Sequence, residues 1–312
     1  MAERDARRRT NGGRTGREGR GPSRSAQARR HVEEMARSLP EEISRAVAGT
    51  RSFDGAPAQQ VAEPCMPSVA VTDEDSVAAV LRLGRGIASA CDLAVLDFAS
   101  FTQPGGGYER GAWGQEQALC ADSFLYNVLA EKASWYAENR RRNINCQLFR
   151  NRALVVPRVR FERDGYHSYA DVIVAAAPDA RRAREEYHVG EDALATALAD
   201  RVRMVMAIAD ELGHKKLVLG AFGCGVFGWD AAQVAEAFRV ELASGTHAAS
   251  EVTFAVPRGR ADEHLEVFEH TFATFPEVNA APYVSRAERA AAEAARADEA
   301  AAEEEDDWRQ YL

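Results

Sequence analysis

The amino-acid sequence predicts an α/β domain whose central sheet is covered by helices on both faces. Three runs of strand length are almost wholly apolar: "LAVLDFAS" (93–100), "YADVIVAAAP" (169–178) and "KKLVLGAF" (215–222). Such runs are typical of strands that are buried on both faces. Stretches with helical spacing of apolar residues lie between them, and this alternation is typical of an α/β fold.

The N-terminal elements are predicted in order along the chain. Residues 26–48 have helical spacing with a break at Pro40, so a small helical lead-in is expected. The segment "PSVAVT" (67–72) predicts a short strand. Thr72 is the expected N-cap of the helix that follows, with Asp75 in the capping-box position.

The remaining elements alternate in the same way. Apolar residues in 115–142 come close to a helical period, which places Glu116 and Gln117 in the first turn of a helix. A strand is expected at "ALVVPRVRFE" (153–162), and a long helix over 192–212 should end at Gly213. A helix at "AAQVAEAFRVELA" (231–243) and a strand at "EVTFAV" (251–256) complete the set.

Length and composition indicate an intracellular protein. The 312 residues are enough for one large domain or two small ones. The five cysteines form no CxxC pair and no Cys/His cluster at metal-ligand spacing, which disfavours disulfides and structural zinc. No apolar run reaches the roughly 20 residues that span a bilayer, and no signal peptide is apparent. We therefore expect a soluble cytoplasmic protein with no membrane partner, metal or cofactor.

The two ends of the chain carry opposite charge, although the net charge is -9. Residues 1–27 form a basic, Arg/Gly-rich arm that is expected to be disordered, and 285–312 form an acidic, Ala/Glu-rich tail that is expected to be partly helical. The lead-in (28–64) and the main domain (65–284) lie between them. The arm is interpreted as a solvated tail, or alternatively as a weak contact for nucleic acid or an acidic polymer.

Two glycine-rich loops follow apolar strands. The stretch "PGGGYERGAWGQEQALC" (104–120) contains Gly105, Gly106 and Gly107, and "GAFGCGVFG" (220–228) has GxGxxG spacing. Glycines let a phosphate approach backbone amides, and a helix N-terminus favours an anion. A tight turn also explains GxGxxG. A dinucleotide-binding fingerprint is disfavoured, because the loop follows a late strand and the next strand has no acidic residue at its end. We expect a phosphate-rich ligand between the loops.

Taken together, "VLDFASFTQPGGGYERGAWGQEQALC" and "LVLGAFGCGVFGWD" resemble the microbial poly(ADP-ribose) glycohydrolases, which are macrodomain proteins whose signature is three glycines, a spacer of six to eight residues and Gln-Glu-Glu. The resemblance covers roughly residues 28–260. It implies a three-layer α/β/α macrodomain-like fold with a mixed, mostly parallel central sheet and an N-terminal helical extension. It also implies that the partners are ADP-ribose, poly(ADP-ribose) or ADP-ribosylated macromolecules.

The resemblance also implies a set of ligand-binding residues. The strand end would hold the terminal ribose, the first loop would wrap the ribose and diphosphate, and the second loop would cradle the diphosphate. The residues are Asp97, Phe98, Ala99, Gly105, Gly106, Gly107, Gln115, Gly223, Cys224, Gly225, Val226, Phe227 and Gly228.

Several of these residues also have ordinary structural explanations. Asp97 fits a capping carboxylate at a strand end, and Phe227 fits a core position. Cys224 fits a small buried side chain better than a nucleophile. Asp230 is expected to be the N-cap of the next helix.

Gln117 occupies the position of the family's catalytic Glu. Cleaving the ribose–ribose bond requires a proton on the departing oxygen, which an amide cannot supply. Two alternatives retain a carboxyl group as the acid. With a six-residue spacer the triplet becomes Gly-Gln-Glu, and Glu116 is then the acid. With the seven-residue spacer Glu116 would act from its own position, although holding a ribose hydroxyl suits it better there.

The sequence therefore predicts an ADP-ribose-binding domain that hydrolyses polymer or conjugates weakly or in altered form. Three alternative functions remain: hydrolysis of another ADP-ribose linkage, binding of ADP-ribose without catalysis, and nucleotide binding by an unrelated domain.

Overall fold

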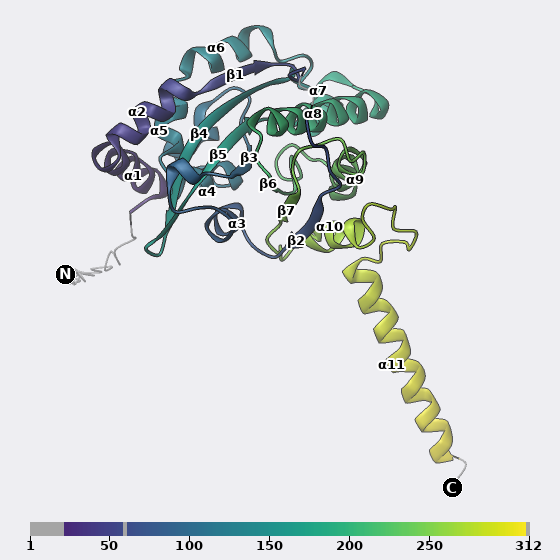
Figure 1. Ribbon diagram of the computed structural model, residues 1–312. Coiled ribbons are helices and arrows are strands. Elements are labelled where there is room, and N and C mark those ends of the chain that lie inside the picture. Colours follow the sequence, from purple (N-terminus) through teal and green to yellow (C-terminus); the bar gives the residue numbers. More distant parts are fainter. Residues whose placement is uncertain (1–21, 59–60, 310–312) are drawn as a thin grey trace, which may run out of the picture.

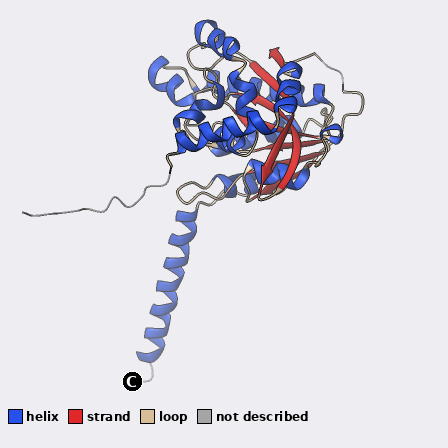
Figure 2. Cartoon of the chain, turned by 90° about the vertical axis from the view of Figure 1, so that its left-hand side faces the viewer, coloured by secondary structure: helices blue, strands red, loops and turns tan. Residues whose placement is uncertain are grey.

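The computed structural model describes residues 22–58 and 61–309, and it contains a seven-stranded sheet between two layers of helices (Figures 1 and 2). The strand order is β1-β4-β5-β3-β6-β7-β2. Neighbouring strands are parallel from β5 through to β2, whereas β4 runs antiparallel to both β1 and β5. The mixed, mostly parallel sheet that the sequence predicts is confirmed. The strands are β1 (Arg51–Asp54), β2 (Ser68–Thr72), β3 (Leu93–Phe98), β4 (Arg152–Arg163), β5 (Tyr166–Ala175), β6 (Lys216–Leu219) and β7 (Glu251–Ala255).

Each face of the sheet forms its own hydrophobic core, because side chains alternate between the faces along a strand. In β3, Leu93 and Val95 belong to one core, and Ala94 and Leu96 belong to the other. The first core is covered by α1 (Arg24–Ser38), α2 (Pro40–Gly49), α3 (Ser76–Leu83), α4 (Gln115–Ala121), α5 (Leu125–Ala130) and α6 (Ala133–Arg142). The second is covered by α7 (Ala180–Tyr187), α8 (Glu191–Leu212), α9 (Ala231–Leu242) and α10 (His264–Phe272).

Several boundaries differ from the sequence prediction. The N-cap of α3 is Asp75, whose side chain accepts a hydrogen bond from the Ala78 amide at 2.9 Å, whereas Thr72 ends strand β2. The helix begins only at Ser76, so the cap falls on Asp75, the residue directly before it, and Thr72 instead pairs with β7. The segment 115–142 is three short helices rather than one. Gly213 ends α8 with a left-handed backbone, and Asp230 caps α9, as predicted.

Both ends of the described chain are helical. The sequence predicts a disordered arm over 1–27, but α1 begins at Arg24 behind its N-cap Ser23. Residues 1–21 of that arm lie outside the described residues. The acidic tail contains the helix α11 (Arg286–Arg309), which projects away from the sheet. Among the helices of the described chain, none is both long and apolar enough to cross a membrane.

Candidate functional site

The two glycine loops leave the same edge of the sheet from adjacent strands. Strand β3 leads into η2 (Pro104–Arg110), a short segment of tight turns that contains the three glycines. Strand β6 leads into the loop 220–230, which ends where α9 begins. Because β3 and β6 pair in parallel, both loops lie at the carboxyl ends of neighbouring strands. This is the edge at which open α/β sheets bind ligands.

Gln115 holds the first turn of α4 against the end of β3. Its side-chain oxygen accepts a hydrogen bond from the Phe98 amide at 2.9 Å. Its side-chain nitrogen donates to the Leu96 carbonyl at 2.9 Å and to the Ser76 hydroxyl at 3.1 Å. All three hydrogen bonds are internal to the protein. In this structure Gln115 therefore positions its two neighbours on α4.

Glu116 and Asp97 place two buried carboxyl groups behind the first loop. Oε2 of Glu116 accepts a hydrogen bond from the Ser100 amide at 2.8 Å, whereas Oε1 is buried without a partner in the described residues. Asp97 is fully buried at the end of β3, and both of its carboxyl oxygens are likewise unpartnered there. Asp97 therefore does not act as a simple capping carboxylate.

Burial favours the protonated form of both carboxyl groups. It raises the pKa of Asp97 well above its usual value. Burial first, and then the neighbouring Asp97 carboxyl, raise the pKa of Glu116 in the same direction. A carboxyl that stays protonated is a hydrogen-bond donor, so Glu116 is chemically suited to hold a sugar hydroxyl or to deliver a proton, whereas Asp97 is fully buried behind it.

Gln117 is buried beside Glu116 and contacts the first glycine loop. Its Nε2 donates to the Gly105 carbonyl at 3.0 Å. Gly106 has a left-handed φ of 56°, and a Cβ atom there would lie 2.4 Å from Oε2 of Glu116 and 2.5 Å from Nε2 of Gln117. Only glycine lets the loop pass this close to the two side chains. The structure thus brings the predicted loop and the predicted catalytic positions into direct contact.

The second loop presents free backbone amides. Within the described chain, the amides of Gly225, Val226 and Phe227 donate no hydrogen bond to a protein acceptor. Gly225 and Val226 are exposed, and no heavy atom lies within 4 Å of a Cβ built at Gly225. Successive unpaired amides ahead of a helix N-terminus are a typical anion-binding arrangement. The loop therefore fits the predicted cradle for a diphosphate.

Gly223 and Cys224 of the second loop have structural roles. A Cβ atom at Gly223 would lie 2.7 Å from the side chains of both Ala177 and Trp229, so this position needs glycine for packing. Burial raises the pKa of Cys224 to about 12, which keeps the thiol protonated at neutral pH. Cys224 is consequently a small buried side chain and not a nucleophile.

An aromatic cluster joins the two loops. Phe101 stacks on Phe149 with ring centroids 4.5 Å apart, and Phe149 meets the edge of Phe227 at 6.0 Å. Asn139 on α6 supports the first loop by donating to the Phe101 carbonyl at 2.8 Å. Phe227 is half-buried, so it serves the core and leaves part of its ring accessible. Phe101, Phe149 and Asn139 carry no sequence motif, so only the fold identifies them.

The helical lead-in supports the first loop from the outside. Helix α1 packs against η2, and Arg24 lies over the ring of Trp113, 5.5 Å from its centroid. His31 on the same helix bonds through Nε2 to the Ser123 carbonyl at 2.9 Å. The lead-in is therefore part of the framework of the site.

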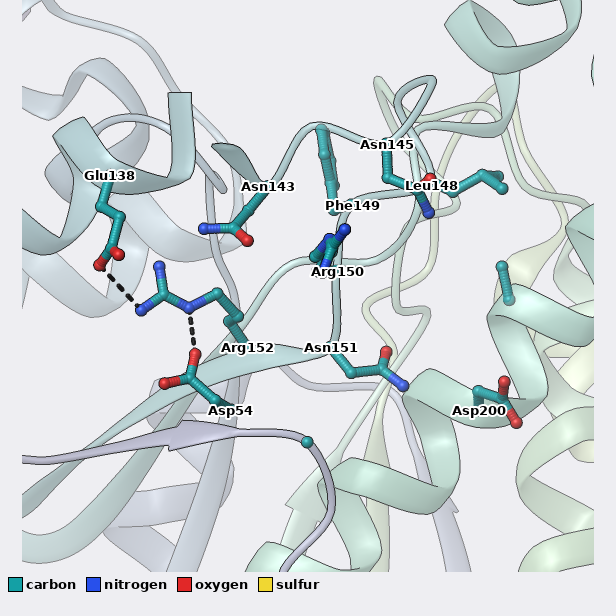
Figure 3. A pocket seen from close by; sticks show the side chains of 12 residues that line it. Asp54, Glu138, Asn143, Asn145, Leu148, Phe149, Arg150, Asn151, Arg152 and Asp200 are labelled. Carbon is teal, nitrogen blue, oxygen red and sulfur yellow. Dashed lines mark hydrogen bonds and ion pairs between the residues drawn. The ribbon is translucent and has the colours of Figure 1, made fainter. Parts of the chain in front are cut away.

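A polar hollow of about 720 Å³ lies near the loops, between α6, α8 and the start of β4 (Figure 3). Arg152 pairs with Asp54 and, at 3.2 Å, with Glu138 on its wall. Phe149 also lines the hollow and links it to the aromatic cluster, but neither glycine loop contributes a residue. The two loops, and not this hollow, carry the arrangement suited to a phosphate.

The chain matches known proteins over most of its length. Residues 25–164 match the family described as microbial-type PARG, catalytic domain. A poly(ADP-ribose) glycohydrolase from Thermomonospora curvata is 30% identical, with 78% of this chain and 97% of that chain covered and a TM-score of 0.67.

Two solved structures of such enzymes contain ligands. The Thermomonospora curvata enzyme bound to the inhibitor ADP-HPD is 30% identical over 80% of this chain and 99% of that one, with a TM-score of 0.67. The Deinococcus radiodurans enzyme in complex with ADP-ribose is 32% identical, with 74% of this chain and 96% of that chain covered and a TM-score of 0.64. No curated protein matches the chain. From the fold, the two loops and these matches, the chain belongs to the microbial-type poly(ADP-ribose) glycohydrolase family.

Proposed function

We propose that this protein binds ADP-ribose between its two glycine loops and hydrolyses ADP-ribose polymer or conjugates weakly or in altered form. The main support is the run of unpaired amides at 225–227, which suits the diphosphate of such a ligand. Relatives of the same fold have been solved with ADP-ribose and with ADP-HPD. The Gly105–Gly107 segment lies over Glu116 and would hold the ribose against it.

The proposal of weak hydrolysis rests on Gln117. A general acid must give up a proton to the leaving oxygen, and the amide of Gln117 is far too weak an acid to do so. Its nitrogen is also already bonded to the Gly105 carbonyl. Losing a general acid typically costs on the order of 10² to 10⁴ in rate. Binding should be affected far less, because the amide keeps a donor and an acceptor in nearly the same shape.

A specific observation favours Glu116 as the group that remains for proton transfer. Burial and the neighbouring Asp97 raise its pKa and favour its protonated form, and Oε1 has no protein partner in the described chain. In the protonated form it can donate to a ribose hydroxyl, which is the role we assign to it. If it reaches the leaving oxygen instead, hydrolysis proceeds through an altered geometry.

The proposal also includes poly(ADP-ribose) as a partner, a role for the basic N-terminal arm and a cytoplasmic location. The basic residues of segment 1–27 would attract anionic poly(ADP-ribose), or nucleic acid, through long-range charge. The five cysteines are all unpaired, as is usual in a reducing cytoplasm.

Calorimetry with the full chain tests the binding step. We expect ADP-ribose to bind with one-to-one stoichiometry without added metal, and NAD to compete poorly. Absence of both heat and thermal shift at millimolar ADP-ribose would remove the basis of the proposal. Equal binding of NAD would instead favour a general nucleotide-binding domain.

A further inference from the structure

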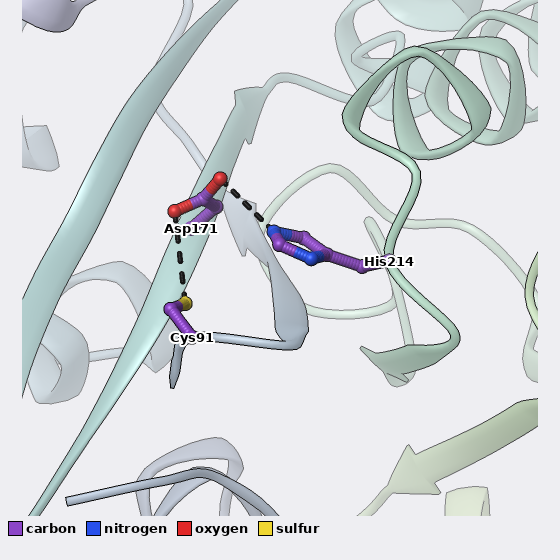
Figure 4. Close-up of side chains that lie close together, drawn as sticks. All are labelled: Cys91, Asp171 and His214. Carbon is purple, nitrogen blue, oxygen red and sulfur yellow. Dashed lines mark hydrogen bonds and ion pairs between the residues drawn. The ribbon is translucent and has the colours of Figure 1, made fainter. Parts of the chain in front are cut away.

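Three side chains with metal-binding donor atoms meet at the opposite edge of the sheet from the glycine loops (Figure 4). They are Cys91 just before β3, Asp171 in β5 and His214 just before β6. The Cys91 sulfur lies 3.8 Å from Oδ1 of Asp171, and Nε2 of His214 lies 3.0 Å from Oδ2. One ligand atom from each residue lies within 4.8 Å of the other two.

This spacing is close to that of a tetrahedral zinc site. Zinc binds thiolate sulfur at about 2.3 Å and imidazole nitrogen or carboxylate oxygen at about 2.0–2.2 Å, so tetrahedral ligands lie roughly 3.3–3.6 Å apart. The contacts of 3.8 and 3.0 Å fall on either side of that range, and all three donor atoms lie within 4.8 Å of one another. Small side-chain movements would therefore bring all three donors to a common centre. The combination of sulfur, nitrogen and oxygen suits zinc better than calcium or magnesium, which prefer oxygen.

The surroundings fit a site that can be filled from solution. The side chains of Asp171 and His214 are 13% and 15% exposed, so they are neither sealed in the core nor free on the surface. The Arg158 amide, at an irregularity in the pairing of β4 with β5, donates to Oδ1 of Asp171 at 2.7 Å and fixes the carboxylate. Such supporting hydrogen bonds orient the ligands in protein metal sites.

The Cys91 thiol makes a weak contact with the Asp171 carboxylate, with Sγ 3.8 Å from Oδ1. A bound metal ion would take the place of the thiol proton, because thiolate is the form that coordinates zinc.

We propose that Cys91, Asp171 and His214 bind one Zn²⁺ ion, with water as the fourth ligand. The ion would join β5 to the segments that enter β3 and β6, and so stabilise the central strands from the edge that the ligand does not use. This proposal differs from the expectation of no metal site, which was based on spacing along the chain. The three residues are far apart in sequence, and only the parallel strands bring them together.

Metal titration of the chelator-treated full chain tests the proposal. We expect one Zn²⁺ per chain by elemental analysis, and a rise in thermal midpoint on adding Zn²⁺. Co²⁺ should occupy the same site and give the near-ultraviolet absorption of a cobalt–thiolate bond. Cys91→Ser should remove that absorption and weaken Zn²⁺ binding by at least roughly tenfold. Cys146→Ser, at an exposed cysteine, is the matched control and should change neither.

The outcomes separate this site from the ligand site. Absence of a cobalt–thiolate band in the wild-type protein would overturn the proposal, as would equal Zn²⁺ affinity in wild type and Cys91→Ser. If Cys91→Ser does not fold, the Co²⁺ spectrum of the wild type and the Zn²⁺ affinity of His214→Gln test the proposal instead. ADP-ribose affinity should be the same with and without Zn²⁺, so failure of either proposal leaves the other standing.

Discussion

Replacing Gln117 by Glu should restore hydrolysis of poly(ADP-ribose). The new side chain has almost the same shape and would lie where Gln117 now donates to the Gly105 carbonyl. The position is buried beside Glu116, which favours the protonated form of a new carboxyl. A protonated carboxyl can keep the hydrogen bond to Gly105 in the ligand-free protein and give its proton to the leaving oxygen when substrate binds.

The magnitudes follow from this environment. A restored general acid should raise the rate on the order of 10² to 10⁴, which lowers the activation free energy by about 2.7–5.5 kcal/mol. The unfolded chain releases the new proton near pH 4.3, so holding it in the folded protein at pH 7 costs at most about 3.7 kcal/mol of unfolding free energy. At pH 5 the same cost is about 1 kcal/mol. The similar shape of Gln and Glu alone would predict a smaller loss of stability. The larger expected loss comes from burial of the new carboxyl group.

The assay compares release of free ADP-ribose from polymer by wild type, Gln117→Glu and Glu116→Gln, at pH 5 and pH 7 and at saturating enzyme. Urea unfolding of the same samples checks the predicted loss of stability. We expect slow or no release by wild type and fast release by Gln117→Glu. If wild type is already as fast and Glu116→Gln abolishes release, Glu116 is the acid and our assignment of Gln117 is wrong. If all three bind ADP-ribose and none releases it, the protein is a reader or acts on another linkage.

Three further predictions concern charge, the second loop and the arm. Asp97→Asn should become more stable relative to wild type as pH rises from about 4 to 7. The raised pKa of Asp97 in the folded protein makes the unfolding free energy of wild type fall with rising pH, and Asn removes this effect. Urea midpoints without this trend would contradict the prediction. Gly225→Val should fold normally yet lose the calorimetric signal of ADP-ribose, whereas Gly86→Val at the opposite edge should retain it; unchanged affinity at 225 would make the loop a mere turn. Deleting residues 1–21 should weaken binding of long polymer at low salt but not of monomeric ADP-ribose, and equal polymer affinity would assign the arm no binding role.

The sequence predicted the sheet because its strands are apolar on both faces, which short-range pattern detects well. It also predicted both loops, because glycine is required where the backbone passes close to side chains. At Gly106 this requirement is visible as the contact with Glu116 and Gln117. A local constraint of this kind fixes the residue type as glycine, so it can be recognised in the sequence.

Features that depend on distant segments could not be predicted. The pairing of Asp97 with Glu116 joins a strand end to a helix start across the glycine loop, and its effect on pKa comes from burial. Cys91 and His214 meet only because β3 and β6 are neighbours in the sheet. None of these is a property of residue spacing along the chain.

The contact between Gln117 and the Gly105 carbonyl has a consequence for how this protein can evolve. A carbonyl oxygen accepts equally from an amide N–H or a protonated carboxyl O–H, so the fold accommodates Gln or Glu at this position without remodelling its neighbours. The codons for these two residues differ by a single nucleotide. On the role that we propose for position 117, one such point mutation would convert a binding protein into a hydrolase, or the reverse, and would leave the ligand site intact.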